Sequence, residues 1–578
     1  MHNVINHYKA ARAELEAPGS PFETTTIEVR GVPVRVFKSA PPNMRVLWEA
    51  TAAHGDKEYV VYEDEHYSYA QIHEQVRKLA AASVTQGVQP GDRIALAMRN
   101  YPEWITGYWA GIAVGAAVVG MNAWWTPSEM EYALNDSQPK VLVVDGERLE
   151  RLMQVVDGVR SRLPHAMHVI SVRTDGPLPS DAQRWDDVMA QADPGTLPAV
   201  AIDPDDDATI FYTSGTTGFP KGAQLTHRGS VHNLLNIVYM GTAVASAEAK
   251  AAAAGEIPAP AAPSTNPPVF MAPTPLFHVT ACNCVLHPAT ASGAKIVLMY
   301  KWDAGRALEL IERERATNFS GVPTMGRELL MHPDWSKRDT STLVGISGGG
   351  SAVQPDLVQK IDKALEKGAP TTGYGMTETH GIITANSSRF YLAKPASCGP
   401  VVPVLDYKLV DEEGNDLPMT PDTTGVLCVR GSIVIKGYIN RPEATADSIR
   451  DGWLNTGDIA RIDEDGWVFI VDRAKDMVIR GGENVYCSEV EAAIYLYDAV
   501  AEAIVFGVPD DRLGEEVAAV IVPREGHTID ENELRAFLKD KLAAYKIPSK
   551  IWTRTELLPR NASGKFLKRE VRKEILGA

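Results

Sequence analysis

The stretch Tyr212-Thr-Ser-Gly-Thr-Thr-Gly-Phe-Pro-Lys-Gly222 gathers hydroxyl side chains, glycines and one lysine within eleven residues. Glycines let backbone N–H groups come close to a ligand, and hydroxyl and ammonium groups donate hydrogen bonds to phosphate oxygens. The stretch is not a P-loop, because Pro220 precedes Lys221 and Gly222 follows it, where a P-loop continues into a helix. A surface turn is the alternative for so short a match. The stretch therefore predicts a loop that binds the phosphates of a nucleoside triphosphate.

Seven further motifs follow this stretch, and their order along the chain is more informative than any one of them. They are Pro275-Leu-Phe-His278, Ser347-Gly-Gly-Gly350, Thr372-Gly-Tyr-Gly-Met-Thr-Glu378, Trp453-Leu-Asn-Thr-Gly-Asp458, Asp472-Arg-Ala-Lys-Asp476, Gly481-Gly-Glu-Asn484 and Pro559-Arg-Asn-Ala-Ser-Gly-Lys565. Together they resemble the adenylate-forming superfamily, which includes acyl-CoA synthetases, peptide-synthetase adenylation domains and beetle luciferases. The resemblance extends from about residue 45 to the C-terminus.

The resemblance implies an α/β fold with two domains of unequal size. Residues 1–472 are expected to form a large N-terminal AMP-binding domain of doubly wound α/β subdomains plus a β-barrel-like subdomain. Residues 473–578 are expected to form a small, mobile α+β domain, and about 100 residues is a common domain size. The boundary falls near Asp472, where a strand predicted at Trp467–Val471 gives way to a charged segment.

Composition is ordinary for a soluble globular protein and argues against some partners. At 578 residues the chain exceeds what one hydrophobic core usually holds, so two or more domains are expected. The net charge of −17 argues against nucleic acid as a partner. Between Lys539 and Lys573, however, there are 11 Lys or Arg residues and only 3 Asp or Glu residues. This basic stretch indicates either a polyanionic ligand such as coenzyme A or an ordinary solvated helix.

Five cysteines, at positions 282, 284, 398, 428 and 487, occur in a chain without a secretory pattern at its N-terminus. This usage favours reduced thiols and a cytoplasmic location. Cys282 and Cys284 have no second Cys or His pair nearby at the spacing of a zinc site. We therefore expect them to be buried thiols.

Residues Trp104–Ser128 contain no charged side chain and are long enough to cross a bilayer. Their glycines and alanines favour instead a buried helix followed by a central strand at Ala116–Gly120, after a strand at Arg93–Met98. A capping box with proline at the first position, Thr126-Pro-Ser-Glu129, predicts the start of the next helix, and Lys140–Val144 predicts the next strand. This alternation predicts an α/β fold, and no transmembrane segment is expected.

The segment from Gly241 to Pro268 is rich in alanine and proline. It is predicted to be a loop with one short helical turn rather than a domain boundary. Because it lies between two of the motifs, it resembles an insertion. A cover over a substrate entrance and a disordered surface excursion are both open.

By resemblance, the first stretch and Glu378 would handle the triphosphate and its metal. Glu378, with Thr216, would hold Mg²⁺, a hard cation that suits carboxylate and phosphate oxygens. Thr377 would contact the α-phosphate. The residues expected to hold the β- and γ-phosphates are Thr213, Ser214, Gly215, Thr216, Thr217, Gly218 and Lys221.

The nucleoside would lie between an aromatic ring and backbone that can approach closely. By resemblance, Tyr374 would offer its ring to adenine, while Asp458 would accept hydrogen bonds from the ribose hydroxyls with help from Arg473. The other residues expected to line this site are Gly348, Gly349, Gly350, Gly375 and Met376.

The resemblance also assigns roles to two lysines and a histidine. Lys565 would bridge the α-phosphate and the substrate carboxylate, which offsets charge as two anions approach. Lys475 would be the pivot on which the C-terminal domain rotates to admit a thiol. His278 would gate the thiol tunnel, and Gly481 and Gly482 would line the pantetheine path. The expected catalytic residues are Lys565, Thr213, Glu378 and His278.

Four positions depart from the family pattern: Ala281, Thr372, Val426 and Cys487. Ala281 stands where glycine is common, Thr372 where Asn or Gln is usual, Val426 where glutamate is usual and Cys487 where proline is frequent. None removes a charge needed for adenylation. They concern the acyl pocket and the docking of the C-terminal domain.

The sequence therefore predicts an ATP- and Mg²⁺-dependent acid–thiol ligase that forms an acyl-adenylate and passes the acyl group to coenzyme A. The acyl pocket is expected around residues 278–284, 322–325 and 348–376, which are mostly apolar or small and offer no evident cation. A medium- or long-chain fatty acid is the first expectation, and an aryl or arylalkanoic acid the second. An amine or carrier-protein acceptor, a luciferase-like monooxygenase and a catalytically silent binding protein are alternatives. The resemblance leaves a homodimer open.

Overall fold

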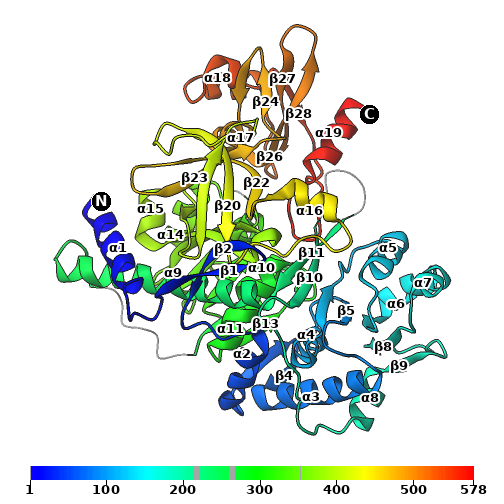
Figure 1. The fold of residues 1–578 in the computed structure, drawn as a ribbon. Helices are drawn as coiled ribbons and strands as arrows, with labels where there is room; N and C mark the ends of the chain where they lie inside the picture. The colour runs from blue at the N-terminus through cyan, green and yellow to red at the C-terminus, as the bar shows by residue number, and fades with distance from the viewer. Residues whose placement is uncertain (1, 214–219, 260–266, 352, 578) are drawn as a thin grey trace.

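The computed structural model describes residues 2–213, 220–259, 267–351 and 353–577. Two large, mainly parallel sheets with helices packed around them form most of the molecule (Figure 1). The first sheet has seven strands in the order β11-β10-β6-β5-β7-β8-β9. Its strands are β5 (Arg93–Ala97), β6 (Ala117–Gly120), β7 (Val141–Asp145), β8 (His168–Val172), β9 (Ala182–Arg184), β10 (Asp207–Thr213) and β11 (Lys221–Thr226).

The second sheet has eight strands in the order β17-β16-β15-β14-β12-β13-β3-β4. Its six central strands, from β16 to β3, run parallel to one another, and both end strands pair antiparallel. Parallel strands end at one edge of the sheet, which is where such folds place their ligands. The strands are β3 (Glu58–Tyr62), β4 (Glu65–Ser68), β12 (Val269–Ala272), β13 (Lys295–Leu298), β14 (Asn318–Gly321), β15 (Gly345–Gly349), β16 (Ala369–Met376) and β17 (Gly381–Ser387).

The uncharged run after Glu103 folds as predicted, into helix α4 (Pro102–Val114) followed by strand β6. Glycines let the helix approach the sheet closely: a Cβ added at Gly107 would lie 2.7 Å from Leu96 Cδ2, and one at Gly111 would lie 2.6 Å from Val118 Cγ2. The next helix, α5 (Pro127–Ser137), has the predicted capping box and proline at its start. Among the described residues, no helix has both the length and the apolar character needed to cross a bilayer.

The alanine-rich segment after Gly241 differs from the prediction. Helix α9 (His227–Ala253) continues through its first half, so the predicted loop with one short turn is wrong for residues 241–253. Alanine is the strongest helix former, and Ala243, Ala247 and Ala251 recur every four residues on one buried side of the helix. Ala243 and Ala247 pack against Tyr8 and Ala11 of helix α1 (His2–Leu15), and this tertiary contact extends α9.

An antiparallel sheet occupies the place expected for the β-barrel-like subdomain. Its path is β18-β23-β22-β20-β19, with β21 paired to β22. The strands are β18 (Gly399–Pro400), β19 (Leu405–Val410), β20 (Thr424–Gly431), β21 (Ile449–Arg450), β22 (Trp453–Ile462) and β23 (Trp467–Arg473). The predicted strand at Trp467–Val471 is thus confirmed and runs two residues further, through Arg473.

The chain then enters a separate five-stranded sheet in the order β25-β24-β27-β26, with β28 beside β27. Its strands are β24 (Val478–Arg480), β25 (Glu483–Val485), β26 (Val500–Asp510), β27 (Gly514–Pro523) and β28 (Lys550–Thr553). Helices α17 (Cys487–Ile494), α18 (Glu531–Lys539) and α19 (Lys568–Leu576) accompany it. Figure 1 shows this small α+β part at the top of the molecule, beyond the antiparallel sheet, so the molecule has a large N-terminal and a small C-terminal domain.

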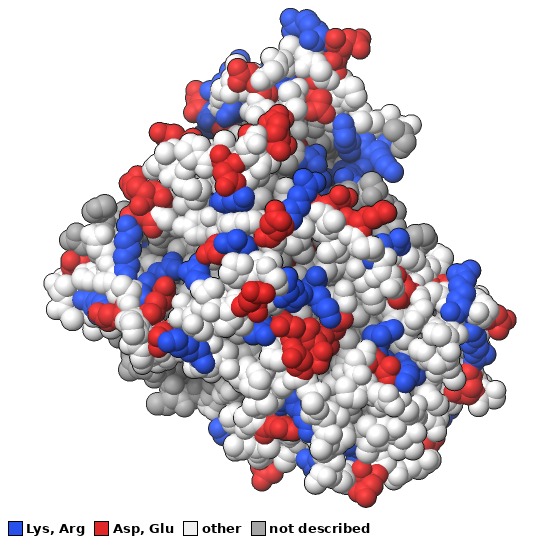
Figure 2. Space-filling view, viewed as in Figure 1, with Lys and Arg blue, Asp and Glu red and all other residues white. Residues whose placement is uncertain are grey.

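Charge and thiols are distributed much as the sequence predicts. Figure 2 shows Lys and Arg side chains gathered where Figure 1 places α19, the helix that carries Lys568, Arg569, Arg572 and Lys573. All five cysteines are free thiols. Cys282 is fully buried, and Cys284 is partly buried.

Candidate active site

The carboxyl end of β16 brings the predicted adenine and metal residues to one place. Tyr374, Gly375 and Met376 end the strand, and a short 3-10 turn (Thr377–Thr379) follows with Glu378. Gly375 must be glycine here, because an added Cβ would lie 1.7 Å from the Gly381 carbonyl oxygen. Close packing of two backbones thus fixes where the strand ends and the Glu378 turn begins.

Tyr374, Asp458 and Arg473 meet, although they come from β16, β22 and β23. The Tyr374 hydroxyl donates a hydrogen bond of 2.7 Å to Asp458 Oδ2, and Arg473 Nε lies 3.4 Å from Asp458 Oδ1. Antiparallel pairing of β22 with β23 sets Asp458 directly opposite Arg473. Asp458 is only 6% exposed, and burial raises its pKa while the Arg473 charge opposes that rise. The three residues predicted to recognise the nucleoside therefore form one group, held by a hydrogen bond and an ion pair.

Glu378 and Lys221 are brought together by a residue that the sequence analysis missed. The Tyr438 hydroxyl donates to Glu378 Oε1 at 2.8 Å, and Lys221 Nζ lies 4.2 Å from the centroid of the Tyr438 ring. A cation over an aromatic ring is attracted by the electrons of that ring. No local pattern singles out Tyr438, because its two partners lie far away in the sequence.

Thr213 and Lys221, the two ends of the predicted phosphate loop, are opposite each other in the antiparallel pair β10–β11. The strands therefore hold the ends of the loop side by side, close to Tyr438 and Glu378. The predicted loop residues Ser214, Gly215, Thr216, Thr217 and Gly218 lie outside the described residues. The predicted metal role of Thr216 lies outside them too.

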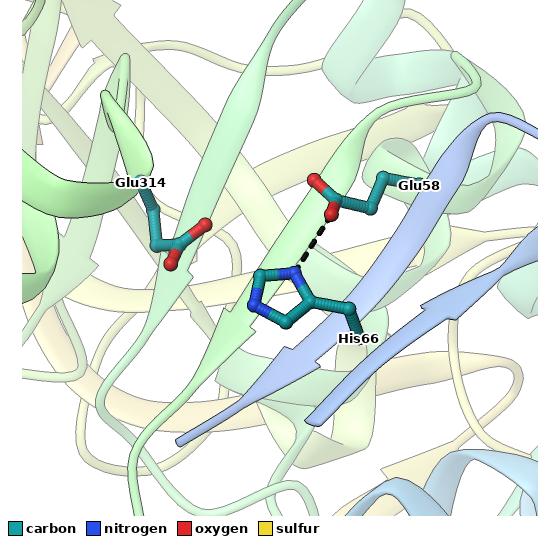
Figure 3. A group of neighbouring side chains, drawn as sticks. All are labelled: Glu58, His66 and Glu314. Carbon is teal, nitrogen blue, oxygen red and sulfur yellow. Dashed lines mark hydrogen bonds and ion pairs between the residues drawn. The ribbon is translucent and has the colours of Figure 1, made fainter. Parts of the chain in front are cut away.

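A second group of potential metal ligands lies elsewhere, at the edge of the eight-stranded sheet. Figure 3 shows Glu58 and His66 joined by a hydrogen bond, with the Glu314 carboxylate facing them. One ligand atom from each lies within 4.8 Å of the others. Lys295 Nζ, however, lies 3.0 Å from Glu58 and 2.8 Å from Glu314, so an ammonium group already neutralises these carboxylates. We interpret the group as an ion-pair network that joins the buried Glu314 to the exposed Glu58 and His66.

Lys565 reaches the site from the C-terminal domain. A Cβ added at Gly350, which has a φ of +81°, would lie 3.0 Å from Lys565 Cε. Burial, with a smaller contribution from the Arg473 charge, lowers the pKa of Lys565 to about 8, and Asp458 and Glu378 oppose the shift. The charges of Arg473, Asp458 and Glu378 therefore all act on the Lys565 ammonium group.

His278 lies near Lys565 and is uncharged at neutral pH. Burial, with a smaller contribution from the Lys565 charge, lowers its pKa to about 3. Its Nε2 atom is buried and has no hydrogen-bond partner among the described residues. The preceding residue, Phe277, packs edge-on against Trp124. A neutral ring with an unpaired nitrogen is suited to contact a passing ligand, while its gating role stays a prediction.

The pivot and pantetheine residues lie farther out. Lys475 is exposed in the segment between β23 and β24. Gly481 and Gly482 form the turn between β24 and β25 with φ values of +61° and +89°, which glycine adopts without strain. Their glycine identity thus has a structural reason, and their predicted ligand roles stay predictions.

Two of the departures from the family pattern make hydrogen bonds of their own. The Thr372 hydroxyl donates to the Gly348 carbonyl oxygen at 3.0 Å and ties β16 to β15 beneath the site. The Cys487 backbone N–H donates to Asp472, a bond that proline could not make because it has no N–H. This second bond fastens helix α17 to the end of β23.

Comparison with known proteins identifies the family of this chain. The family model for AMP-binding enzyme matches residues 47–439, and that for the AMP-binding enzyme C-terminal domain matches residues 489–565. A feruloyl-CoA synthase from Amycolatopsis sp is 37% identical over 88% of this chain and 94% of its own length. A long-chain-fatty-acid–CoA ligase from Bacillus subtilis (strain 168) is 33% identical over 92% of this chain and 94% of its own.

A solved structure shows the same likeness. The anthranilate CoA ligase AuaEII, in complex with anthranoyl-AMP, superposes with a TM-score of 0.80 at 25% identity. The match covers 92% of this chain and 97% of that one. The chain belongs to the AMP-binding enzyme family, with both its AMP-binding domain and its C-terminal domain present.

Proposed function

We propose that this protein is an ATP-dependent CoA ligase that activates a hydrophobic carboxylic acid as an acyl-adenylate and transfers the acyl group to coenzyme A. The observation that carries the proposal is the position of Lys565 beside Gly350, where Asp458 and Glu378 act on its charge. A lysine whose pKa is lowered, in the field of two carboxylates, is typical of a functional site. We assign residues 1–472 to the adenylation domain and residues 473–578 to the mobile domain.

In the first half-reaction a carboxylate oxygen of the substrate attacks the α-phosphorus of ATP, and pyrophosphate leaves. Both reactants are anions, so the protein must offset their repulsion. Lys565 would contact the α-phosphate and the carboxylate together. Asp458 and Tyr374 orient the nucleoside, with Arg473 fixing the carboxylate of Asp458.

Thr213, Lys221 and the loop between them would hold the departing phosphates. The Glu378 carboxylate, oriented by Tyr438, is a donor that fits Mg²⁺, as carboxylate and phosphate oxygens are its usual ligands. When bound, Mg²⁺ would neutralise charge on the phosphates. Thr377, next to Glu378, would contact the α-phosphate.

In the second half-reaction the thiol sulfur of coenzyme A attacks the acyl carbonyl carbon, AMP leaves and the thiol proton passes to solvent. We propose that the C-terminal domain rotates about Lys475 between the two steps. Lys565 then withdraws, and Gly481 and Gly482 approach the path of the pantetheine arm. The names of the relatives, which are CoA ligases or synthases, support coenzyme A as the acceptor.

Substrate chemistry follows from the uncharged residues around His278. At neutral pH His278 is neutral, and burial raises the pKa of the Cys284 thiol to about 12, so both are uncharged. A substrate with a second charged group would find no counter-charge in either residue. We favour an aryl or arylalkanoic acid, because the feruloyl-CoA synthase is more similar to this chain than the fatty-acid ligase. The medium- or long-chain fatty acid predicted first from the sequence is the second candidate.

Pyrophosphate release tests the proposal. The purified protein is given ATP, Mg²⁺ and one acid from a panel of hydroxycinnamates, benzoates, arylalkanoates and fatty acids, each with and without coenzyme A. We expect release that accelerates with coenzyme A and a thioester product, with aryl acids preferred. Pyrophosphate release at the same rate with and without coenzyme A would indicate that the acyl acceptor is an amine or a carrier protein. ATP binding without release for any acid would overturn the proposal.

A further inference from the structure

Arg560 lies five residues before Lys565 and belongs to the same tight turn. The Asn561 backbone N–H donates to the Lys565 carbonyl oxygen at 2.9 Å, and Asn561 Oδ1 accepts from the Lys565 N–H at 3.0 Å. An isolated antiparallel β-bridge pairs Arg560 with Phe566 and closes the turn. Because the turn is held together in this way, whatever fixes Arg560 also fixes the backbone that carries Lys565.

Within its own domain, Arg560 is anchored by a buried carboxylate. Its Nη2 donates to Glu502 Oε1 of strand β26, and Glu502 is only 5% exposed. The other oxygen of Glu502 accepts from the Leu558 backbone N–H at 2.8 Å. These contacts stay inside residues 473–578, so Arg560 moves with the small domain.

The other edge of the guanidinium crosses to the large domain. Arg560 Nη1 lies 3.0 Å from Glu328 Oε1, on helix α13 (Pro323–Met331). Glu328 Oε2 accepts from the Trp302 indole N–H, and the Trp302 ring packs against Phe319 of β14. The large domain thus orients Glu328 by a contact that does not depend on Arg560.

Two neighbouring contacts mark the same helix as the surface on which the Lys565 turn docks. The Arg327 guanidinium lies 5.3 Å from the centroid of the Tyr495 ring of the small domain, and Asp356 holds that guanidinium through two bonds of 2.9 Å. Gly564 lies against Val322, because a Cβ added there would be 2.9 Å from Val322 Cγ2. The start of α13 therefore receives the turn, and Glu328 supplies the acidic contact between this helix and Arg560.

We propose that the Arg560–Glu328 pair is a latch that positions Lys565 for the adenylation half-reaction. The inference rests on the proposed function, since that function assigns Lys565 to the first half-reaction. A planar guanidinium can serve Glu502 and Glu328 at once, which the single ammonium group of lysine does less well. Rotation of the small domain would break the Glu328 contact and leave the Glu502 contact intact. The pair therefore favours one domain arrangement over the other.

The latch is tested by Glu328→Gln, which removes the negative charge that Arg560 contacts in the large domain and leaves every residue of the small domain unaltered. Glu531→Gln is the matched control. It breaks a Glu–Arg pair of the same length, since Glu531 lies 3.0 Å from Arg535, but both residues of that pair belong to helix α18 of the small domain. We expect Glu328→Gln to slow acyl-adenylate formation by about five- to tenfold, as for a partly buried ion pair. Conversion of supplied acyl-adenylate to thioester should stay within about twofold of wild type.

A second readout needs no substrate. Hydrogen exchange of the backbone amides of Asn561, Gly564 and Lys565 should quicken in Glu328→Gln, while amides of β26 and β27 keep their wild-type rates. Arg560→Lys, which keeps a positive charge, should give a smaller loss of adenylation than Arg560→Gln. Equal loss in the two half-reactions, or unchanged exchange in the turn, would overturn the latch. Faster exchange without pyrophosphate release for any acid would mean that the contact is real and the proposed function is wrong.

Discussion

The Tyr438 hydroxyl donates a hydrogen bond of 2.8 Å to Glu378 Oε1, across a separation of 60 residues in the sequence. The ring of the same tyrosine lies under the Lys221 ammonium group, 4.2 Å from its nitrogen. One side chain thus fixes the carboxylate proposed to hold Mg²⁺ and the lysine proposed to hold phosphate. Partners that orient a metal-binding group usually matter nearly as much as the group itself.

Replacing Tyr438 with phenylalanine should weaken the response to Mg²⁺. Tyr438→Phe keeps the ring beneath Lys221 but leaves Glu378 without its hydrogen bond. We expect the Mg²⁺ concentration for half-maximal pyrophosphate release to rise by about tenfold, with a smaller change in the KM for the acid. Tyr438→Leu, which also removes the ring, should lower release further. An unchanged Mg²⁺ curve for Tyr438→Phe would show that Glu378 needs no orientation.

Lys565→Ala should separate the two half-reactions. Removing the ammonium group takes away the charge that offsets the approaching anions, so acyl-adenylate formation should fall by about 100- to 1000-fold. Supplied acyl-adenylate should still be converted to thioester at close to the wild-type rate. The two rates are measured separately, by pyrophosphate release and by thioester formation. Equal loss of both would refute the proposed division of roles.

The rate of adenylation should fall on the alkaline side. Lys565 acts as a cation, and burial lowers its pKa to about 8 in the free protein. It is therefore charged below about pH 8 and neutral above it. We expect kcat/KM for ATP to be level below this value and to fall by about tenfold per pH unit above it.

Lys565→Arg is the control for this pH profile, because a guanidinium keeps its charge at high pH. That variant should lose the alkaline fall even if its overall rate is lower. The alkaline fall in kcat should occur at higher pH than the fall in kcat/KM, because bound phosphates favour the charged form of Lys565 and so raise its pKa. His278, with a pKa of about 3, contributes nothing above pH 5. A fall at the same pH in Lys565→Arg would assign it to another group.

Local signals in the sequence were enough for the elements that depend on nearby residues. The capping box at Thr126 predicts the start of α5 because its donors and acceptors lie within one helical turn. The end of α9 is different, since Ala243 and Ala247 are held in a helix by α1, more than 200 residues earlier. Composition alone favoured a loop there.

The residues of the candidate site also differ in how far the sequence predicts them. Asp458, Arg473 and Lys565 belong to contiguous motifs, and the structure brings all three to one place. Tyr438 and Glu328 belong to none, because only the fold brings their partners near. Glu328 and Arg560, for example, are 232 residues apart. Residues that orient others rather than touch the ligand carry little local signal, so the sequence predicts the reacting groups better than their supports.

Lys475→Pro should trap one arrangement of the domains. Lys475 is exposed between β23, which ends at Arg473, and β24, which begins at Val478, so the chain must change direction there if the small domain rotates. Proline fixes φ and restricts the residue before it. Complete turnover needs both arrangements, so we expect overall thioester formation to fall by about 100-fold or more while one half-reaction keeps its rate. Lys475→Ala, which leaves the backbone free, should lose far less. Wild-type turnover in Lys475→Pro would place the pivot elsewhere, and equal loss of both half-reactions would indicate a damaged domain rather than a trapped one.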